Sequence, residues 1–430
     1  MHNVMKKGII YLPVEVKVRE LDAKLLLAYY AAKNGFLVVI GDHEMVEIAT
    51  GKFKQGIFFS KGYPHGFRKR VITSAINNGH TVVELDEEGL IMNRKRYLRD
   101  RMKKDMLQLV THEYCWGGNQ KDIIIDAYPE YREKCHVVGN PRFDLLKPKF
   151  RDIYNDDAEN IKQLHGDFVL INTRFSQYNS ANGKKENVHF RHIKKLFYYF
   201  IEMIKNICEK FPDLNFIVRP HPGEDFSSYR KALSQYKNVH VIHEGNIIKW
   251  ILASRVIIHN GCTSGIEAFL LGKPVISYVP ITTNKIESNL PNTLGVKATS
   301  ITSVQNYLSH LLDQPNINEN NFDENEVEDT ERELFSYIQW SKDNYSYESI
   351  IDLCNTIKLQ NITHEDIPTG NIGNSEIKVS KKKYKRNFHL TETEIHSLYN
   401  KLDKIEGVHN SMEINRIGNN LYQVQSSSGS

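Results

Sequence analysis

The chain has 430 residues, of which 40% are hydrophobic and 25% are charged, and its formal net charge is +4. This length exceeds what one hydrophobic core usually supports, so we expect two domains. The net charge is too small to indicate a nucleic-acid partner. Five scattered cysteines without a CxxC pair argue against a disulfide framework and a zinc site, and no apolar stretch is long enough for a signal sequence or a membrane span. We therefore expect a cytoplasmic protein.

The first 150 residues predict one α/β domain. Short apolar runs alternate with amphipathic helical patterns at residues 20–34 and 65–79. Strands separated by helices of this length are typical of a parallel sheet that is covered on both faces. The expected strands are residues 8–12, 36–42, 56–60, 81–85, 107–112 and 135–140.

Residues 151–315 predict a second domain of the same class, after a polar linker near residues 147–160. Its strands are expected to alternate with helices, the longest of which covers residues 191–211. We expect the two doubly wound domains to face a central cleft, because ligands of open α/β sheets bind outside the carboxyl ends of the strands. The expected strands are residues 167–173, 214–220, 238–243, 255–261 and 274–280.

The C-terminal quarter of the chain is less regular. We expect closing helices within residues 316–360, and then a linker, a basic run and a small helical segment within residues 361–430. Thr391 and Glu394 predict a capping box at the start of a helix. The basic run is typical of a solvated tail, and the alternative is that it holds the chain at an anionic membrane face; its cations are Lys381, Lys382, Lys383, Lys385 and Arg386.

The stretch RPHPGED, residues 219–225, follows an apolar run that is typical of a buried strand. Two prolines bracket His221 and fix the direction of its backbone at the strand end. His221 can there donate to a phosphate oxygen or transfer a proton, and Arg219 can add a planar fork for a phosphate or carboxylate. The alternative is a turn in which Arg219 pairs with Glu224 or Asp225.

The stretch HNGCTSGIEA, residues 259–268, predicts a phosphate cradle. A strand runs into a loop rich in glycine and hydroxyl side chains, and a helix then begins whose free N–H groups and positive dipole end favour an anion. Glu267 in the first turn can accept hydrogen bonds from ribose hydroxyls. The alternative is an ordinary turn with a Ser or Thr cap. The residues expected in the cradle are Gly261, Thr263, Ser264, Gly265 and Glu267.

These two stretches, with VVGNPRFDLL and the opening LPVEVKVRELDAKLLLAYYAAKNGFLVVIGD, resemble the GT-B glycosyltransferases of bacterial surface-carbohydrate assembly. The similarity is greatest to the CMP-Kdo-dependent Kdo transferases of capsule and lipopolysaccharide. It implies two Rossmann-like domains, and transfer of Kdo or a related nonulosonic acid from a CMP-activated donor to a glycan or glycolipid acceptor without a metal or cofactor. It also implies that His221 contacts the nucleotide phosphate and that Thr263 and Ser264 complete the CMP site.

Three alternatives stay open beside that resemblance. Teichoic-acid glycerophosphotransferases and nucleotide-sugar 2-epimerases share the architecture, so the chain can equally be a UDP-sugar transferase or an epimerase. A non-catalytic nucleotide- or carbohydrate-binding subunit is the alternative from another class. The donor, and not the architecture, is what distinguishes the first two readings from the Kdo transferases.

The first domain is expected to bind the acceptor. Arg19, Glu20 and Asp22 begin its first helix directly after a strand, where they can bind acceptor hydroxyls or a donor carboxylate. Glu113 follows the expected strand at residues 107–112. A carboxylate in a partly desolvated cleft can act as general base for a sugar hydroxyl, so Glu113 is the predicted base.

The segment INTRFSQYN follows the first expected strand of the second domain. Asn172, Arg174 and Asn179 are expected to bind the hydroxyls of the donor sugar or its carboxylate, unless this is simply a polar loop. The segment offers no carboxylate nucleophile, so the stereochemical course stays open. In the GNPRFD stretch, Arg142 and Asp144 are expected to form a structural pair.

Overall fold

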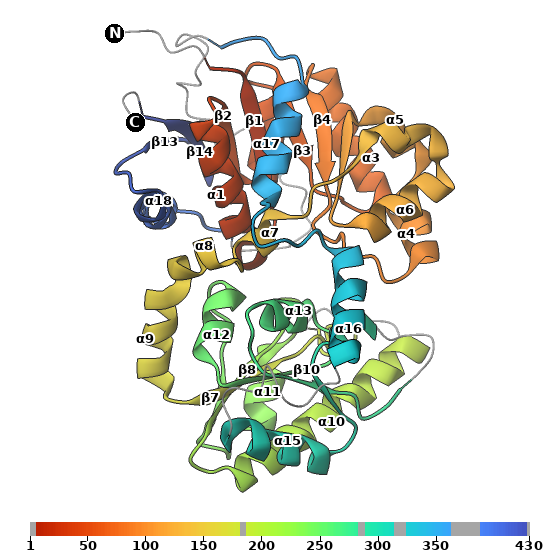
Figure 1. The fold of residues 1–430 in the computed structure, drawn as a ribbon, viewed down its shortest axis with the longest axis vertical. Coiled ribbons are helices and arrows are strands. Elements are labelled where there is room, and N and C mark those ends of the chain that lie inside the picture. The colour runs from red at the N-terminus through yellow and green to blue at the C-terminus, as the bar shows by residue number, and fades with distance from the viewer. Residues whose placement is uncertain (1–5, 181–185, 283–288, 314–323, 363–387, 428–430) are drawn as a thin grey trace. The chain divides into compact units, whose positions relative to one another are not determined.

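The computed structural model describes residues 6–180, 186–282, 289–313, 324–362 and 388–427. The chain divides into two compact units. Unit 1 comprises Met1–Ile153 and Phe335–Ser430, and unit 2 comprises Tyr154–Leu334. The chain therefore leaves unit 1 once, builds unit 2, and returns. Each unit is built on one sheet with helices packed against it (Figure 1).

Unit 1 contains an eight-stranded sheet in the order β13-β14-β2-β1-β3-β4-β5-β6. The six strands from β1 to β6 are parallel, whereas β14 is antiparallel to β2 and β13 is antiparallel to β14. The central strands are buried along their whole length, as expected for a sheet covered on both faces. The strands are β1 (Ile9–Val14), β2 (Leu37–Asp42), β3 (Gly56–Ser60), β4 (Thr81–Leu85), β5 (His112–Cys115), β6 (Cys135–Val137), β13 (Met412–Gly418) and β14 (Leu421–Ser426).

The helices of unit 1 begin where the sequence offers helix formers and end at turn residues. The first, α1, is rich in Leu and Ala and ends at Asn34, directly before Gly35 with its φ of +91°. The helices are α1 (Lys17–Lys33), α2 (His43–Thr50), α3 (His65–Asn77), α4 (Arg94–Asp100), α5 (Lys104–Leu109), α6 (Gly118–Ala127), η1 (Pro129–Lys134), α7 (Pro141–Asp144), α8 (Pro148–Arg151), α17 (Ser346–Thr356) and α18 (Glu392–Glu406), while η2 (Asp152–Tyr154) and α16 (Glu324–Tyr337) cross the unit boundaries.

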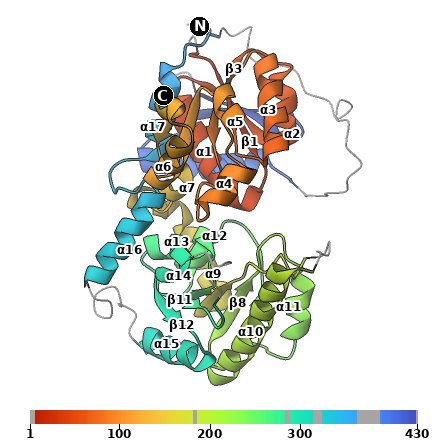
Figure 2. The same ribbon diagram turned by 90° about the vertical axis from the view of Figure 1, so that its right-hand side faces the viewer.

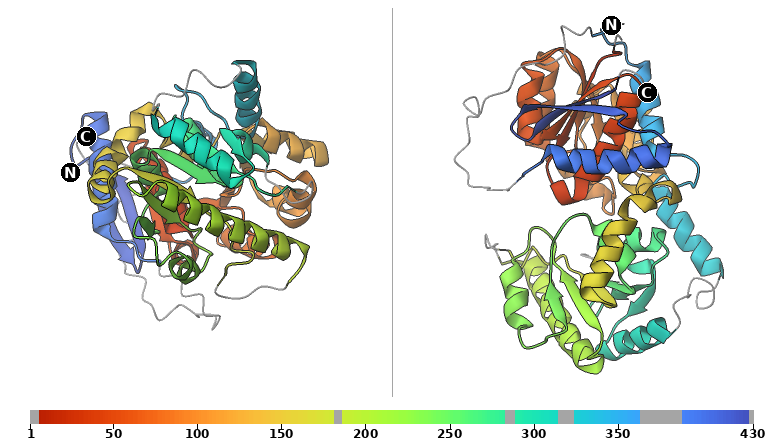
Figure 3. Two further views of the ribbon diagram at one scale, coloured as in Figure 1. Left: turned by 90° about the horizontal axis from the view of Figure 1, so that it is seen from below. Right: turned by 90° about the vertical axis from the view of Figure 1, so that its left-hand side faces the viewer.

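The C-terminal segment belongs to unit 1. Its helix α18 begins with the predicted capping box, which is confirmed: Thr391 accepts from the backbone N–H of Glu394, and Glu394 accepts from that of Thr391. The following hairpin places β14 beside β2 and so extends the sheet (Figure 3). The basic run at residues 381–386 lies outside the described residues.

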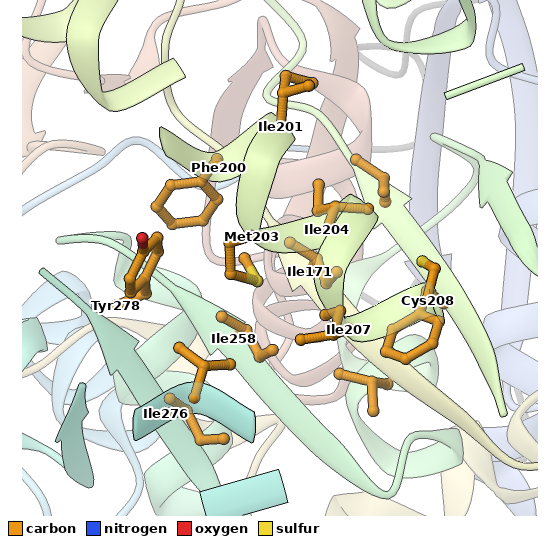
Figure 4. Packing of buried hydrophobic residues seen from close by; sticks show 14 of the residues in the cluster. Ile171, Phe200, Ile201, Met203, Ile204, Ile207, Cys208, Ile258, Ile276 and Tyr278 are labelled. Carbon is orange, nitrogen blue, oxygen red and sulfur yellow. The ribbon is translucent and has the colours of Figure 1, made fainter. Parts of the chain in front are cut away.

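Unit 2 contains a parallel six-stranded sheet in the order β12-β11-β10-β7-β8-β9. Its longest helix, α10, packs Phe200, Ile204 and Ile207 against Ile171 and Ile258 of the sheet (Figure 4). The elements are α9 (Asn155–His165), β7 (Phe168–Asn172), α10 (Val188–Lys210), β8 (Asn215–Arg219), α11 (Phe226–Ala232), β9 (Val239–Val241), α12 (Ile247–Ala253), β10 (Val256–His259), α13 (Thr263–Leu270), β11 (Val275–Tyr278), α14 (Asn289–Thr293), β12 (Val296–Ala298) and α15 (Ile301–Asp313).

Two local expectations are wrong, and one is refined. Residues 107–109 end helix α5, and the strand begins only at His112, because a short apolar run fits a helix as well as a strand. The polar linker near residues 147–160 contains the boundary between the two units and is helical, in α8 and α9. Asp144 does not pair with Arg142: its carboxylate accepts from the Nζ of Lys147 at 2.9 Å and from the backbone N–H of Ser346 and Tyr347, both at 3.0 Å. Asp144 therefore caps α17.

None of the described helices is both long and apolar enough to cross a membrane.

Candidate functional site

The strand order of unit 2 defines one place where a ligand can enter the sheet edge. From β7 the chain continues to β8 and β9 on one side, whereas β10, β11 and β12 lie on the other side. The carboxyl ends of β7 and β10 are therefore neighbours whose following loops run in opposite directions. Ligands of doubly wound sheets bind at such a switch point.

Side chains from both sides meet at this switch point. Asn172, the last residue of β7, is 4% exposed and donates from Nδ2 to the Oγ of Ser264 at 3.0 Å. Arg174 donates to the carbonyl of Gly261, and most of its side chain is exposed. Gly261 has a φ of +56°, which favours glycine, and its N–H donates to Asn292 at 2.6 Å. The loop after β7 is thereby bound to the loop after β10.

Helix α13 begins at this point without a side-chain cap. Its N-cap residue is Cys262, and no side chain of the described residues accepts from the first turn. The predicted Ser or Thr cap is thus not formed, because Ser264 accepts from Asn172 instead. The first N–H groups of a helix attract anions, so the start of α13, with Arg174 beside it, is suited to a phosphate.

Gly265 has a packing role. A Cβ at this position would lie 2.3 Å from Nε2 of His259. The glycine therefore allows α13 to pack directly over the buried His259 ring. Burial, with Arg174 nearby, lowers the pKa of His259 to about 3, so this ring is neutral.

The RPHPGED loop contains a buried carboxylate, that of Glu224, which is hydrogen-bonded to the loop and to its neighbours. Glu224 accepts from the hydroxyl of Tyr229 at 2.5 Å, from the hydroxyl of Thr173 at 2.9 Å and from the backbone N–H of His221 at 3.1 Å. The N–H of Phe175 donates to it as well. Burial raises the pKa of Glu224, although these four donors oppose the shift. Glu224 thus joins the loop after β7, the loop after β8 and helix α11.

The hydrogen bond to His221 fixes which ring nitrogen carries the proton. The N–H of Gly223 donates to Nδ1 of His221 at 3.1 Å, so Nδ1 bears no proton and Nε2 is the N–H of the neutral ring. The side chain is exposed. This tautomer suits donation to a phosphate oxygen better than acceptance of a proton at Nδ1.

Arg219 is engaged within unit 2. Its Nη1 donates to the carbonyl of Glu244 at 3.0 Å and its Nη2 to that of Gly245 at 2.6 Å, and the side chain is buried. The guanidinium that was predicted to bind a phosphate or carboxylate therefore binds two backbone carbonyls. Arg219 pairs with neither Glu224 nor Asp225. Burial lowers its pKa to about 10, while the buried carboxylate of Glu267 in α13 opposes the shift.

Of the remaining predicted residues of unit 2, Thr263 lies at the candidate site, whereas Asn179 connects the loops around it. Thr263, at the start of α13, is half-buried and lies beside Ser264. Asn179 is buried, donates to the carbonyl of Asp225 at 3.1 Å and accepts from Ser228 at 2.9 Å. Because both ends of its amide are used, Asn179 joins two loops and is not placed to bind a sugar.

In unit 1, Glu20 is already neutralised by the chain itself. It is 1% exposed and accepts from Lys61 at 2.8 Å and from Arg19 at 3.1 Å. Burial alone would raise the pKa of Glu20, but Lys61 and Arg19 outweigh it and hold the pKa at about 2. Arg19 also pairs with Glu88 at 2.7 Å. Asp22, predicted with them, is half-buried in α1.

Glu113 is not at a strand end. It lies inside β5, fully buried, with its carboxylate 3.5 Å from the guanidinium of Arg68, which also pairs with Glu84. Burial, and then repulsion from Glu84, raise the pKa of Glu113 well above its usual range. The prediction of an accessible base at the end of a strand is wrong for this residue, because the strand begins later than its apolar pattern indicates.

The carboxylates at a strand end of unit 1 are instead Asp86, Glu87 and Glu88, directly after β4. Asp86 is buried and pairs with Arg101, and Glu87 pairs with Lys24 at 2.8 Å. The side chain of Glu88 is 56% exposed, and Arg19 outweighs the effect of burial and lowers its pKa. The run DEEG directly after the apolar run TVVEL is the sequence signal that could have identified this position.

Within the described part of the chain, no group of three or more His, Cys, Asp and Glu side chains is arranged to bind a metal ion.

Comparison with known proteins identifies the fold. No family model matches the chain, and no curated protein matches it in sequence. A putative UDP-N-acetylglucosamine 2-epimerase from Listeria monocytogenes is 13% identical, with 83% of this chain and 99% of that chain covered and a TM-score of 0.51. A further UDP-N-acetylglucosamine 2-epimerase is 16% identical, with 83% and 98% covered and a TM-score of 0.51.

The wall teichoic acid polymerase TagF is 12% identical, with 82% of this chain and 89% of that chain covered and a TM-score of 0.51. At such identities the similarity concerns the fold alone. The chain has the predicted GT-B fold, with two Rossmann-like α/β domains on parallel sheets.

Proposed function

We propose that this protein is a nucleotide-sugar-dependent enzyme of surface-carbohydrate assembly whose nucleotide binds unit 2 at the carboxyl ends of β7, β8 and β10. The observation that carries the proposal is the uncapped start of α13 at the switch point, with Arg174 beside it. Both features favour a phosphate, and a nucleotide is the common phosphate ligand of this position in doubly wound folds.

The roles of the residues follow from their contacts. Arg174 and the first N–H groups of α13 balance the charge of the leaving nucleotide phosphate, and the Nε2–H of His221 donates to it. Thr263 supplies a further hydroxyl. Glu267, which was predicted to bind the ribose from the first turn, is 2% exposed and lies beyond the first turn of α13, so we assign it no ligand contact. On the acceptor side, Glu88 is the exposed carboxylate of the DEEG run, but its ion pair with Arg19 at 2.7 Å lowers its pKa and makes it a poor base, so we assign no base in place of Glu113.

The first candidate for the donor is a UDP-sugar, used by a transferase or a 2-epimerase. It is supported by the compared structures, two of which are UDP-N-acetylglucosamine 2-epimerases by name. The second candidate is a CMP-activated acidic sugar such as Kdo. The order of the RPHP and HNGCTSG stretches supports it, and Arg174 is an exposed cation that the donor carboxylate would need.

Melting-temperature shifts with UDP, CMP, CDP and GDP test the proposal, because a ligand that binds only the folded state stabilises it. We expect one pyrimidine nucleotide to raise the melting temperature of the wild type and to lose that effect in His221→Ala. A UDP-selective shift supports the first donor and a CMP-selective shift the second. No shift with any nucleotide would contradict a nucleotide site.

The product of the reaction then distinguishes the activities. A transferase hydrolyses its donor slowly without an acceptor, whereas a 2-epimerase releases a UDP-sugar whose configuration at C2 is inverted. Nucleotide binding without donor turnover, with and without glycan acceptors, would instead indicate the non-catalytic binding subunit.

A further inference from the structure

The outer side of α10 is a surface of unit 2 that the proposed reaction does not use. The helix runs along the outside of the unit (Figure 2), and its inner side packs into the core. The outer side of its first half carries three large exposed side chains: Val188 is 67% exposed, Tyr198 is 51% exposed and Tyr199 is 42% exposed. One exposed apolar residue is ordinary, but three on one side of a helix need an explanation.

The same part of the helix is basic. Arg191, Lys194 and Lys195 are exposed, and residues 187–201 contain no Asp or Glu. No carboxylate of the described residues forms an ion pair with these three cations. The charge on this side of the helix is therefore uncompensated, unlike that of Lys205, which lies about three turns after Lys195 and pairs with Glu202 at 2.9 Å.

The cations and the exposed rings share one side of the helix. Successive residues of an α-helix are rotated by about 100°, so residues spaced by three or four positions lie on one side. Val188, Arg191, Lys195, Tyr198 and Tyr199 follow this spacing. The hydroxyl of Tyr198 is hydrogen-bonded to that of Tyr178 at 2.9 Å, which holds the exposed ring in place.

We propose that this side of α10, here called the α10 face and formed by Val188, Arg191, Lys194, Lys195, Tyr198 and Tyr199, binds an anionic lipid surface. Tyrosine rings favour the headgroup level of a bilayer, and unpaired Lys and Arg side chains are attracted to anionic lipids. Tyrosine and arginine are common at protein interfaces too, but lysine is depleted there, so the two adjacent lysines without a carboxylate partner among the described residues are what favours an anionic lipid surface over a protein partner. The inference is independent of the reaction that unit 2 supports.

Vesicle sedimentation of the full chain tests this proposal. We expect binding to phosphatidylcholine vesicles that contain phosphatidylglycerol, weakened by salt, and little binding to phosphatidylcholine alone. A cation near an anionic surface strengthens partitioning about fivefold, so Lys194→Gln with Lys195→Gln lowers the partition coefficient about 25-fold. The matched control, Lys231→Gln with Lys237→Gln, removes the same charge from exposed positions of unit 2 outside α10 and leaves binding unchanged.

Two further variants separate this surface from other sources of binding. Tyr198→Ser with Tyr199→Ser keeps every charge, and we expect it also to weaken binding. Neutralising the five cations of the run at residues 381–386 tests the other basic segment of the chain. The proposal is overturned if the chain binds neutral and anionic vesicles equally, or if the Lys194/Lys195 variant and the Lys231/Lys237 variant bind equally well. It is also overturned if the tyrosine variant binds as the wild type does, or if only the 381–386 variant loses binding.

Discussion

The carboxyl edges of the two sheets both carry polar side chains but use them in opposite ways. In unit 1 the charges neutralise one another: Glu20 with Lys61 and Arg19, Glu87 with Lys24, and Asp86 with Arg101. In unit 2 a buried hydrogen-bonded frame around Glu224 supports an exposed histidine and an uncapped helix start. A charged residue after a strand thus indicates a binding site only where the chain has not already neutralised it.

The largest expected effect concerns the buried ion pairs of unit 1. Lys61→Met keeps the length of the side chain but removes the closer of the two cations that pair with Glu20, while Arg19 stays at 3.1 Å. We expect the free energy of unfolding to fall by about 3 kcal/mol, the lower end of the range for breaking a buried pair, because Arg19 remains. Chemical denaturation measures it. The control Lys17→Met breaks the exposed pair with Glu394, for which the loss is about 0–1 kcal/mol.

The pH dependence sharpens that test. Because the pKa of folded Glu20 is held at about 2, below its ordinary value of 4.5, the pair stabilises the fold above pH 4.5. This contribution is lost as the pH falls from 4.5 towards 2. The Lys61→Met variant should therefore show a smaller fall in stability over that range than the wild type, and an equal fall would contradict the assignment.

The next effect concerns the packing of α13. Gly265→Ala places a Cβ 2.3 Å from the ring of His259, so the helix must shift, and we expect a loss of about 1–3 kcal/mol. Gly66→Ala in α3 meets nothing within 4 Å and serves as the control, with no loss or a gain of up to about 1 kcal/mol. If the two substitutions have the same effect on thermal unfolding, the close approach of α13 to His259 is not important.

A smaller effect is expected on nucleotide affinity. Glu224→Gln removes the charge that accepts from His221, Thr173 and Tyr229, so we expect the Kd of the nucleotide to rise about tenfold. Asp225→Asn makes the same charge change one residue away, where Asn is an equally good N-cap for α11, and is expected to leave the Kd unchanged. Calorimetric titration compares them, and equal affinities of both variants would exclude a positioning role for Glu224.

The smallest effect concerns the C-terminal helix. Thr391→Ala removes the capping box of α18, which costs about 1 kcal/mol in helix stability. We expect a fall of a few degrees in the melting temperature of unit 1 and no change in nucleotide affinity. An altered affinity would mean that the C-terminal segment acts on the site of unit 2.

The parts of the structure that follow from local patterns were predictable from the sequence. The alternation of apolar runs and helices predicts two doubly wound α/β domains, the resemblance of the motifs predicts the GT-B fold, and Thr391 with Glu394 predicts the start of α18. The strand β5 was misplaced because LQLV is as apolar as a strand yet forms the end of α5. The hairpin of β13 and β14 was missed although its strands alternate polar and apolar residues on either side of Gly418, Asn419 and Asn420, which is a hairpin pattern; Asn420 takes a φ of +52° in the turn.

Pairing between residues that are distant in the sequence was not predictable. Nothing near Glu20 indicates that Lys61, 41 positions away, neutralises it, or that the donors of Arg219 go to backbone carbonyls 25 and 26 positions ahead. The switch point itself was foreseeable, because RPHP and HNGCTSG each follow an apolar strand. Glu113 lies inside β5 and not after it, because β5 begins at His112, and the sequence pattern did not define where this strand begins.

The central claim is that a nucleotide binds at the carboxyl edge of the unit 2 sheet, and amide hydrogen exchange of the full chain with saturating UDP or CMP tests it most directly. We predict slower exchange in peptides that cover residues 172–176, 221–225 and 260–266, and unchanged exchange in residues 15–24 of unit 1. Protection that is confined to unit 1, or absent from residues 260–266, would contradict the claim.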